Sequence, residues 1–219
     1  MAKHFQRELE KIKKSILSLG AIVEDRVRLA IKSIDGRDAA IAEQIVNMDY
    51  EIDEMEVDIE EECLKVLALH QPVAIDLRFL VSVIKINNDL ERIADETVNI
   101  AYRIKTISKN KDCRFIFDYA LMAEKASTML RMSLDAMVRL DTDIAYKVCC
   151  MDDDVDVFVV HAYEQLKQSV CAMPDNIGIL MNMFLISRHI ERIADHATNI
   201  AEEVIYVTDG EIVRHGKFT

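Results

Sequence analysis

The segment ERIAD occupies residues 91–95 and returns unchanged at residues 191–195. The identity resumes as NIA at residues 99–101 and again at 199–201. Two matches at one fixed spacing indicate an internal duplication. A chain made of two copies of one unit is expected to fold as two similar halves, and this constrains its architecture more than any other feature.

A second match lies upstream, where MDYEID at 48–53 corresponds to MDDDVD at 151–156, and one proline follows in each copy. The duplication therefore spans most of the 219 residues, in halves of roughly 100 residues that can each bury a core. The only linker-like segment is the polar stretch Ser108–Asp112. We predict a first repeat at 1–108, a second at 112–209, and a short C-terminal tail at 210–219.

The composition predicts an all-α fold, because only five glycines and two prolines are available for turns. Each repeat should contain three long helices joined by short connections, which makes neighbouring helices antiparallel. The expected fold is thus two pseudo-symmetric three-helix bundles. The first helix shows an apolar seam at three- and four-residue steps, formed by Phe5, Leu9, Ile12, Ile16, Leu19, Val23, Val27, Ala30 and Ile34.

Helix boundaries follow from capping residues. Asp38 and Asp141 are predicted N-caps of the second helix in each repeat, and Gly210 is a predicted stop. In the first repeat we expect a single, unbroken second helix that is capped by Asp38 and stops before His70, then a third helix at about 73–108. In the second repeat the corresponding helices are expected at 142–171 and 175–208.

Charge, hydropathy and cysteine spacing argue against a nucleic-acid-binding protein, a membrane-spanning protein and a zinc-thiolate protein. With 39 acidic and 27 basic residues the formal net charge is −12, which argues against nucleic-acid binding because phosphate contacts need clustered Lys and Arg. No apolar run approaches the ~18 residues of a membrane-spanning helix, so a cytoplasmic protein is expected. The five cysteines lack zinc-site spacing and are expected to be reduced thiols, mostly packed.

Each repeat also carries two pairs of acidic residues spaced four apart. On a helix this spacing puts both carboxylates on one face, where like charges disfavour the helix unless a counter-charge is present. In an antiparallel bundle the two pairs of a repeat would lie close together. The pairs are Asp49 with Asp53 and Glu91 with Asp95 in the first repeat, and Asp152 with Asp156 and Glu191 with Asp195 in the second.

Four carboxylates that converge without basic partners suit cations that prefer oxygen ligands. We therefore predict one metal-binding cluster per repeat. A competing explanation is that Arg92 and Arg192, which lie beside the acids, neutralise them through local salt bridges. His161 and His196 have no histidine at the matching position of the other repeat, and both are interpreted as surface residues.

The sequence resembles the PhoU family of phosphate-uptake regulators over nearly its whole length. The segments that carry the resemblance are HQPVAIDLR at 70–78, NDLERIAD at 88–95, IERIADHATNIAEE at 190–203 and VRH at 213–215. The resemblance implies that the eight acids above form the E(D)-x-x-x-D motifs, which in some members hold multinuclear clusters. The implied cofactors are iron, manganese or zinc ions.

The resemblance further implies a cytoplasmic, non-enzymatic adaptor that negatively regulates the phosphate regulon. Such a protein links the ATPase subunit of an ABC-type phosphate transporter to a sensor histidine kinase, and is peripheral at the inner membrane through these partners. Alternatives are an accessory subunit of a non-ABC phosphate permease and a carboxylate–metal enzyme. A homodimer is also expected, because an apolar outer face is available for a bundle–bundle contact or a dimer. This apolar face comprises Leu77, Val81, Ile84, Leu180, Met181 and Phe184.

Overall fold

The computed structural model describes residues 2–110 and 115–213, and in these ranges it contains helices but no strand. The predicted all-α class is therefore confirmed. In chain order the elements are α1 (Ala2–Gly36), α2 (Ala39–Asn47), α3 (Tyr50–His70), α4 (Ala74–Ile107), α5 (Ala120–Arg139), α6 (Thr142–Ala172), the short 3₁₀ helix η1 (Pro174–Asn176) and α7 (Ile177–Asp209).

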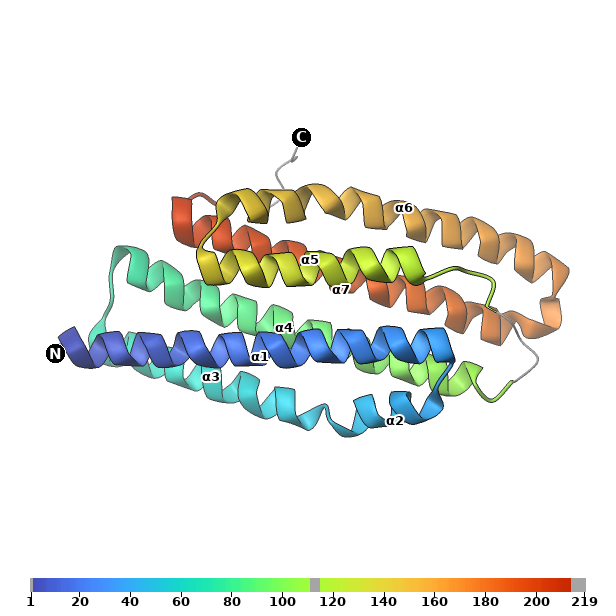
Figure 1. The fold of residues 1–219 in the computed structure, drawn as a ribbon, viewed down its shortest axis with the longest axis horizontal. Helices are drawn as coiled ribbons and strands as arrows, with labels where there is room; N and C mark the ends of the chain where they lie inside the picture. The colour runs from blue at the N-terminus through green and yellow to red at the C-terminus, as the bar shows by residue number, and fades with distance from the viewer. Residues whose placement is uncertain (1, 111–114, 214–219) are drawn as a thin grey trace.

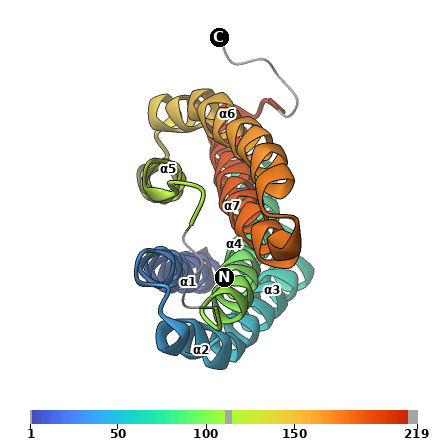
Figure 2. The same ribbon diagram turned by 90° about the vertical axis from the view of Figure 1, so that its right-hand side faces the viewer.

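The helices form two bundles that lie side by side along the long axis of the molecule (Figure 1). The first bundle contains α1, α2, α3 and α4, and the second contains α5, α6 and α7. Seen end-on, α4 and α7 lie next to each other in the middle of the molecule (Figure 2), and they share the most extensive contact of any two elements. The two-bundle prediction is confirmed, with the third helix of each repeat forming the junction.

The predicted seam of α1 is the inner face of that helix. Every residue from Leu9 to Ile34 on the seam is buried, and Phe5 packs partly against the core. The third helices are buried along most of their length, α7 above all, because each packs against its own bundle and against the other repeat. The apolar core is therefore continuous across the two repeats.

The prediction of one unbroken second helix in the first repeat is wrong. The chain turns at Met48–Asp49, between α2 and α3. Met48 has φ −106° and ψ 5°, and the Ile52 amide donates to the Asp49 carbonyl, three residues back, at 2.9 Å. The apolar stripe continues on both sides of the break, which is why the sequence pattern did not reveal it. The second repeat has no such break, and α6 runs unbroken.

The predicted caps are confirmed. The Asp38 carboxylate accepts hydrogen bonds from the amides of Ala40 and Ile41, at 2.8 and 3.1 Å, and the Asp141 carboxylate accepts one from Ile144 at 3.0 Å. Gly210 ends α7 with a φ of 78°, a left-handed conformation that glycine adopts without strain. The start of the last helix differs slightly from prediction, because η1 precedes α7.

Part of the predicted linker and tail lies outside the described residues, namely 111–112 and 214–219, and the VRH segment is affected in the same way. Of the cysteines, Cys63 and Cys149 are buried, Cys150 and Cys171 are exposed, and all four are free thiols. Cys113 lies outside the described ranges. Within the described helices, none is long and apolar enough to cross a bilayer.

The predicted apolar outer face is divided. Leu180 is completely buried, and Ile84 and Phe184 are partly buried against the core. Leu77 and Met181 are 41 and 40 % exposed. The homodimer stays a prediction.

Candidate carboxylate clusters

The first predicted cluster lies where the α2–α3 turn faces α4. Asp49 lies in the turn and Asp53 in the first turn of α3, while Glu91 and Asp95 lie on α4. Burial raises the pKa of Asp49, and the charges of Asp53 and Asp95 raise it further. Burial likewise raises the pKa of Glu91, with Asp95 and Asp53 adding to the effect and Arg92 opposing it. The charges of the four acids therefore act on one another.

The second cluster has the same organisation on α6 and α7. Burial raises the pKa of Asp152 to about 6, with Asp195 and Asp156 as the next causes. Burial also raises the pKa of Glu191, where the charges of Asp195, Asp156 and Asp152 add to the effect. The charges of the i,i+4 pairs on neighbouring helices thus act on one another in both repeats, and the metal clusters stay a prediction.

One carboxylate oxygen in each cluster is buried and has no hydrogen-bond partner: Oε2 of Glu91 and Oε2 of Glu191. The second case is the stronger one, because Glu191 is only 8 % exposed. A buried acceptor without a partner costs free energy, about 1–3 kcal/mol, unless something binds it. The unpaired oxygen belongs to the equivalent glutamate of each repeat, and an arginine lies near both residues, at 3.6 Å from Glu91 Oε2 and 2.6 Å from Glu191 Oε1.

The eight residues fit a hard cation in donor chemistry, since all of their ligand atoms are carboxylate oxygens. Among the described residues, no group of three His, Cys, Asp or Glu side chains is already closed around one point. The carboxylates are neighbours on adjacent helices, so side-chain rotation would be needed to surround an ion.

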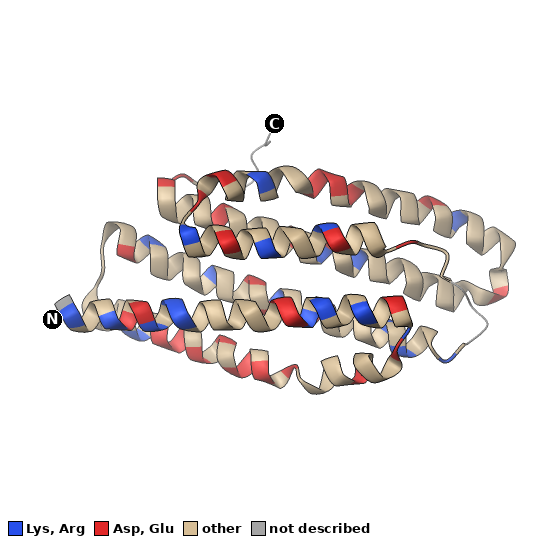
Figure 3. Cartoon of the chain, viewed as in Figure 1, with Lys and Arg blue, Asp and Glu red and all other residues tan. Residues whose placement is uncertain are grey.

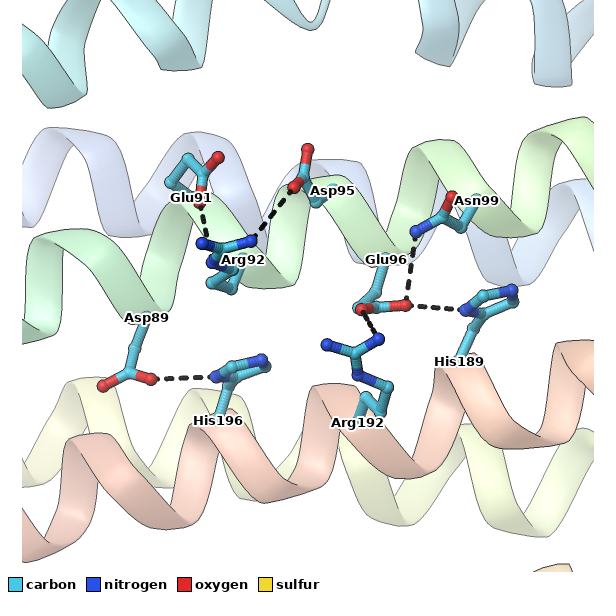
Figure 4. A network of polar contacts seen from close by, with 9 residues as sticks. All are labelled: Asp89, Glu91, Arg92, Asp95, Glu96, Asn99, His189, Arg192 and His196. Carbon is cyan, nitrogen blue, oxygen red and sulfur yellow. Dashed lines mark hydrogen bonds and ion pairs between the residues drawn. The ribbon is translucent and has the colours of Figure 1, made fainter.

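The arginine explanation receives limited support. Arg92 Nε lies 3.6 Å from Glu91 Oε2, and its Nη1 lies 4.0 Å from Asp95 Oδ2 (Figure 4). These contacts are long and the side chain is half-exposed, so each contributes little. Arg192 behaves differently from Arg92, because its Nη1 crosses to the other repeat and contacts Glu96 at 3.0 Å. In the second cluster it is Arg188 that pairs with Glu191, at 2.6 Å.

Sequence reasoning missed a ladder of polar contacts between α4 and α7. Glu96 Oε2 lies 2.6 Å from His189 Nδ1, and Asp89 Oδ1 lies 2.8 Å from His196 Nδ1 (Figure 4). The surface interpretation of His196 is wrong, since its side chain is only 16 % exposed. His161 is exposed, as predicted. The offset between the ERIAD segments relates position 96 to 196 and 89 to 189, so the two pairs are pseudo-symmetric.

Comparison with known proteins agrees with this organisation. The model of the PhoU domain matches the chain twice, at residues 16–104 and 119–204. The phosphate-specific transport system accessory protein PhoU homolog of Pseudomonas aeruginosa is 36 % identical over 216 residues, covering 98 % of this chain and 89 % of that protein. The homolog of Aquifex aeolicus is 36 % identical over 209 residues and covers 95 % of each chain.

Solved structures give the same result. The crystal structure of PhoU from Pseudomonas aeruginosa superposes with a TM-score of 0.90 at 35 % identity, covering 94 % of this chain and all of that chain. The phosphate transport system regulatory protein PhoU from Streptococcus pneumoniae superposes with a TM-score of 0.84 at 29 % identity, covering 95 and 99 %. With two domain matches that account for most of its length, one in each helical bundle, this chain belongs to the PhoU family.

Proposed function

We propose that this protein is a regulatory accessory protein of a phosphate-specific transport system. The observation that carries the proposal is the likeness over nearly the full chain to relatives that bear that description, with both PhoU domains present. Those relatives are described as accessory or regulatory proteins, which supports action by contact with partners.

The partners in this proposal are the ATPase subunit of the phosphate transporter and a sensor histidine kinase. When phosphate is plentiful, the protein connects the two and holds the kinase inactive, so it is a negative regulator of the phosphate regulon. Its surface supports contact with basic partners. Acidic residues gather along α3, where eight of the twenty-one residues are Asp or Glu (Figure 3). Such a surface accelerates association with a positively charged partner at low salt.

The metal sites form the second part of the proposal. Asp49, Asp53, Glu91 and Asp95 would hold cations in the first repeat, and Asp152, Asp156, Glu191 and Asp195 in the second. Bound cations would neutralise the repulsion among the carboxylates. The side chains of each cluster come from two helices, so binding would tie the second helix of each repeat to the third and make the surface presented to partners more rigid.

A strain that lacks the gene tests the regulatory part. A reporter of phosphate-starvation genes should be active in phosphate-rich medium in this strain and repressed again when the wild-type gene returns. A tagged copy recovered from phosphate-replete cells should bring the transporter ATPase or the kinase with it. Normal repression in the deletion strain, with no second copy of such a gene, would refute the adaptor role. Recovery of a non-ABC phosphate permease instead would assign the protein to that transporter.

A further inference from the structure

The break between α2 and α3 faces a buried arginine. Arg26 lies on α1 and is only 4 % exposed, although it carries a full positive charge. Its Nη2 donates to the Glu51 carboxylate at 2.8 Å and to the Met48 carbonyl at 3.5 Å, and its Nη1 lies 3.5 Å from the Met48 sulfur. The guanidinium therefore contacts both sides of the break.

The break removes the helical hydrogen bond to the Met48 carbonyl, and Arg26 lies beside the oxygen that loses it. In a regular helix the Met48 carbonyl would accept the amide of Ile52, but that amide donates to the Asp49 carbonyl. Arg26 Nη2 lies 3.5 Å from the Met48 carbonyl oxygen, a long contact, and its short hydrogen bond goes to Glu51 just beyond the break, at 2.8 Å. The planar guanidinium presents several donors at once, which allows it to bind a carbonyl and a carboxylate together.

The second repeat lacks this arginine. Arg37 and Leu140 both adopt left-handed backbone conformations, and each is followed by a helix-capping aspartate, Asp38 or Asp141. When the two repeats are aligned on these turns, Arg26 of the first repeat corresponds to Met129 of the second.

Met129 is completely buried, carries no charge and has no group that donates a hydrogen bond. The helix opposite it, α6, continues unbroken through Met151 and Asp152, the counterparts of Met48 and Asp49. The helix break and the buried arginine therefore occur together in one repeat and are both missing in the other.

The two clusters consequently have different electrostatic surroundings. In the first cluster, the buried Arg26 guanidinium contacts Met48 and Glu51, the residues on either side of Asp49 and Tyr50. In the second cluster, the Asp152 carboxylate accepts a hydrogen bond from the Thr198 hydroxyl at 3.3 Å. The arginines beside the second cluster, Arg188 and Arg192, are 45 and 48 % exposed, so solvent screens their charges far more than that of Arg26.

We infer that Arg26 is a positioning residue of the first cluster. It holds the helix break on which Asp49 lies and places a buried guanidinium beside that cluster, whereas the arginines beside the second cluster are half-exposed, so the first cluster binds a divalent cation more weakly than the second. This inference rests on the proposed metal sites. Because a charge buried beside a site repels a cation with little screening, removing it should strengthen binding there.

Calorimetric titration of the chelator-treated protein with Mn²⁺ tests the inference. The double change Asp152→Asn with Asp156→Asn removes the second cluster and isolates the first. In that background Arg26→Met, which copies the second repeat, should tighten Mn²⁺ binding about five- to tenfold, the size expected of one partly screened charge. Unchanged or weaker binding would overturn the inference.

Two further variants separate charge from other effects. Arg28→Met removes an exposed arginine of the same helix, with a side chain 77 % exposed, and should change binding less than about twofold. Arg26→Lys keeps the charge and should keep the weak binding; binding as tight as that of Arg26→Met would contradict the role of the charge. If Arg26→Met does not fold, Arg26→Gln, which keeps a hydrogen-bond donor without the charge, takes its place with the same expectation.

Amide hydrogen exchange of the metal-free protein provides a readout that needs no metal. Arg26→Met should increase protection at residues 49–52, because the helix can then continue as it does in α6. Unchanged exchange there would show that Arg26 does not hold the break. If the wild-type protein binds no Mn²⁺ at all, the metal proposal fails, while the exchange result still decides what Arg26 does.

Discussion

The Glu96 carboxylate and the His189 imidazole meet at 2.6 Å across the junction of the two repeats, and both residues are nearly inaccessible to solvent. The pseudo-symmetric pair, Asp89 with His196, uses the same two helix positions with acid and base exchanged. The repeats are thus joined by two carboxylate–imidazole contacts related by the duplication itself. Single residues at this junction accordingly affect both halves of the protein.

Glu96→Ala should destabilise the protein by about 3 kcal/mol, because it leaves His189 and Arg192 without their buried partner. Urea unfolding followed by circular dichroism measures the loss. The matched control is Lys125→Ala, which removes an ion pair with Asp154 at the surface and should cost less than about 1 kcal/mol. Equal costs for the two variants would show that the junction contact contributes no more than a surface pair.

Adding Mn²⁺, Fe²⁺ or Zn²⁺ to the metal-free protein should raise its melting temperature, since a ligand that binds only the folded state stabilises it by about 2.7 kcal/mol at a hundred times Kd. Elemental analysis should find more than about one equivalent per chain, as expected for two clusters. Glu191→Gln should reduce both effects, while Glu54→Gln, an exposed acid on α3, should not. Protein that stays metal-free after reconstitution, with unchanged melting, would exclude the clusters as metal sites.

The metal-free protein should become more stable as the pH falls from about 7 toward 5. Burial, followed by mutual repulsion, raises the pKa of six cluster acids: Asp49, Glu91, Asp95, Asp152, Glu191 and Asp195. A group with a raised pKa in the folded state binds its proton more tightly there, so protonation favours folding. For Asp152 this window runs from about 6 down to the ordinary value of 3.8.

Thermal melts of chelated protein across this range check the sign. Asp152→Asn should flatten the dependence because that carboxylate no longer titrates. Glu96 acts in the opposite direction. Burial raises its pKa, but the hydrogen bond and charge of His189 and the charge of Arg192 lower it overall, so its contribution is lost only at more acidic pH. A wild-type protein whose stability falls steadily from pH 7 to 5, in parallel with Asp152→Asn, would contradict the expectation.

The cysteines should differ in reactivity by their environment. Burial raises the pKa of the Cys63 and Cys149 thiols to about 12, so both should resist a thiol reagent until the protein unfolds. Cys150 and Cys171 are exposed and should react in the native state. The measurement uses a Cys113→Ser background, so that two thiols are expected to react rapidly and two slowly. Rapid reaction of all four would show that the core opens easily.

Much of the fold follows from the sequence alone, because the signals that define it are local. The α1 seam, the capping aspartates Asp38 and Asp141 and the stop at Gly210 each depend on residues within a few turns of one another. The duplication then places the four acidic pairs at equivalent positions, and their i,i+4 spacing puts each pair on one helical face. These local features are enough to predict the two bundles and to single out the eight acids, because neither prediction needs tertiary contacts.

The tertiary structure decided the features that join distant segments. The break at Met48–Asp49 interrupts an apolar stripe that looks continuous, and the short hydrogen bond beside it, at 2.8 Å, comes to Glu51 from Arg26 on another helix. The pairing of Glu96 with His189 depends on how α4 and α7 are placed against each other. Periodicity reports which face of a helix is apolar, but it does not report which helix covers that face or which polar side chains meet there. Those contacts depend on the packing of the two repeats, and packing is set by the whole chain.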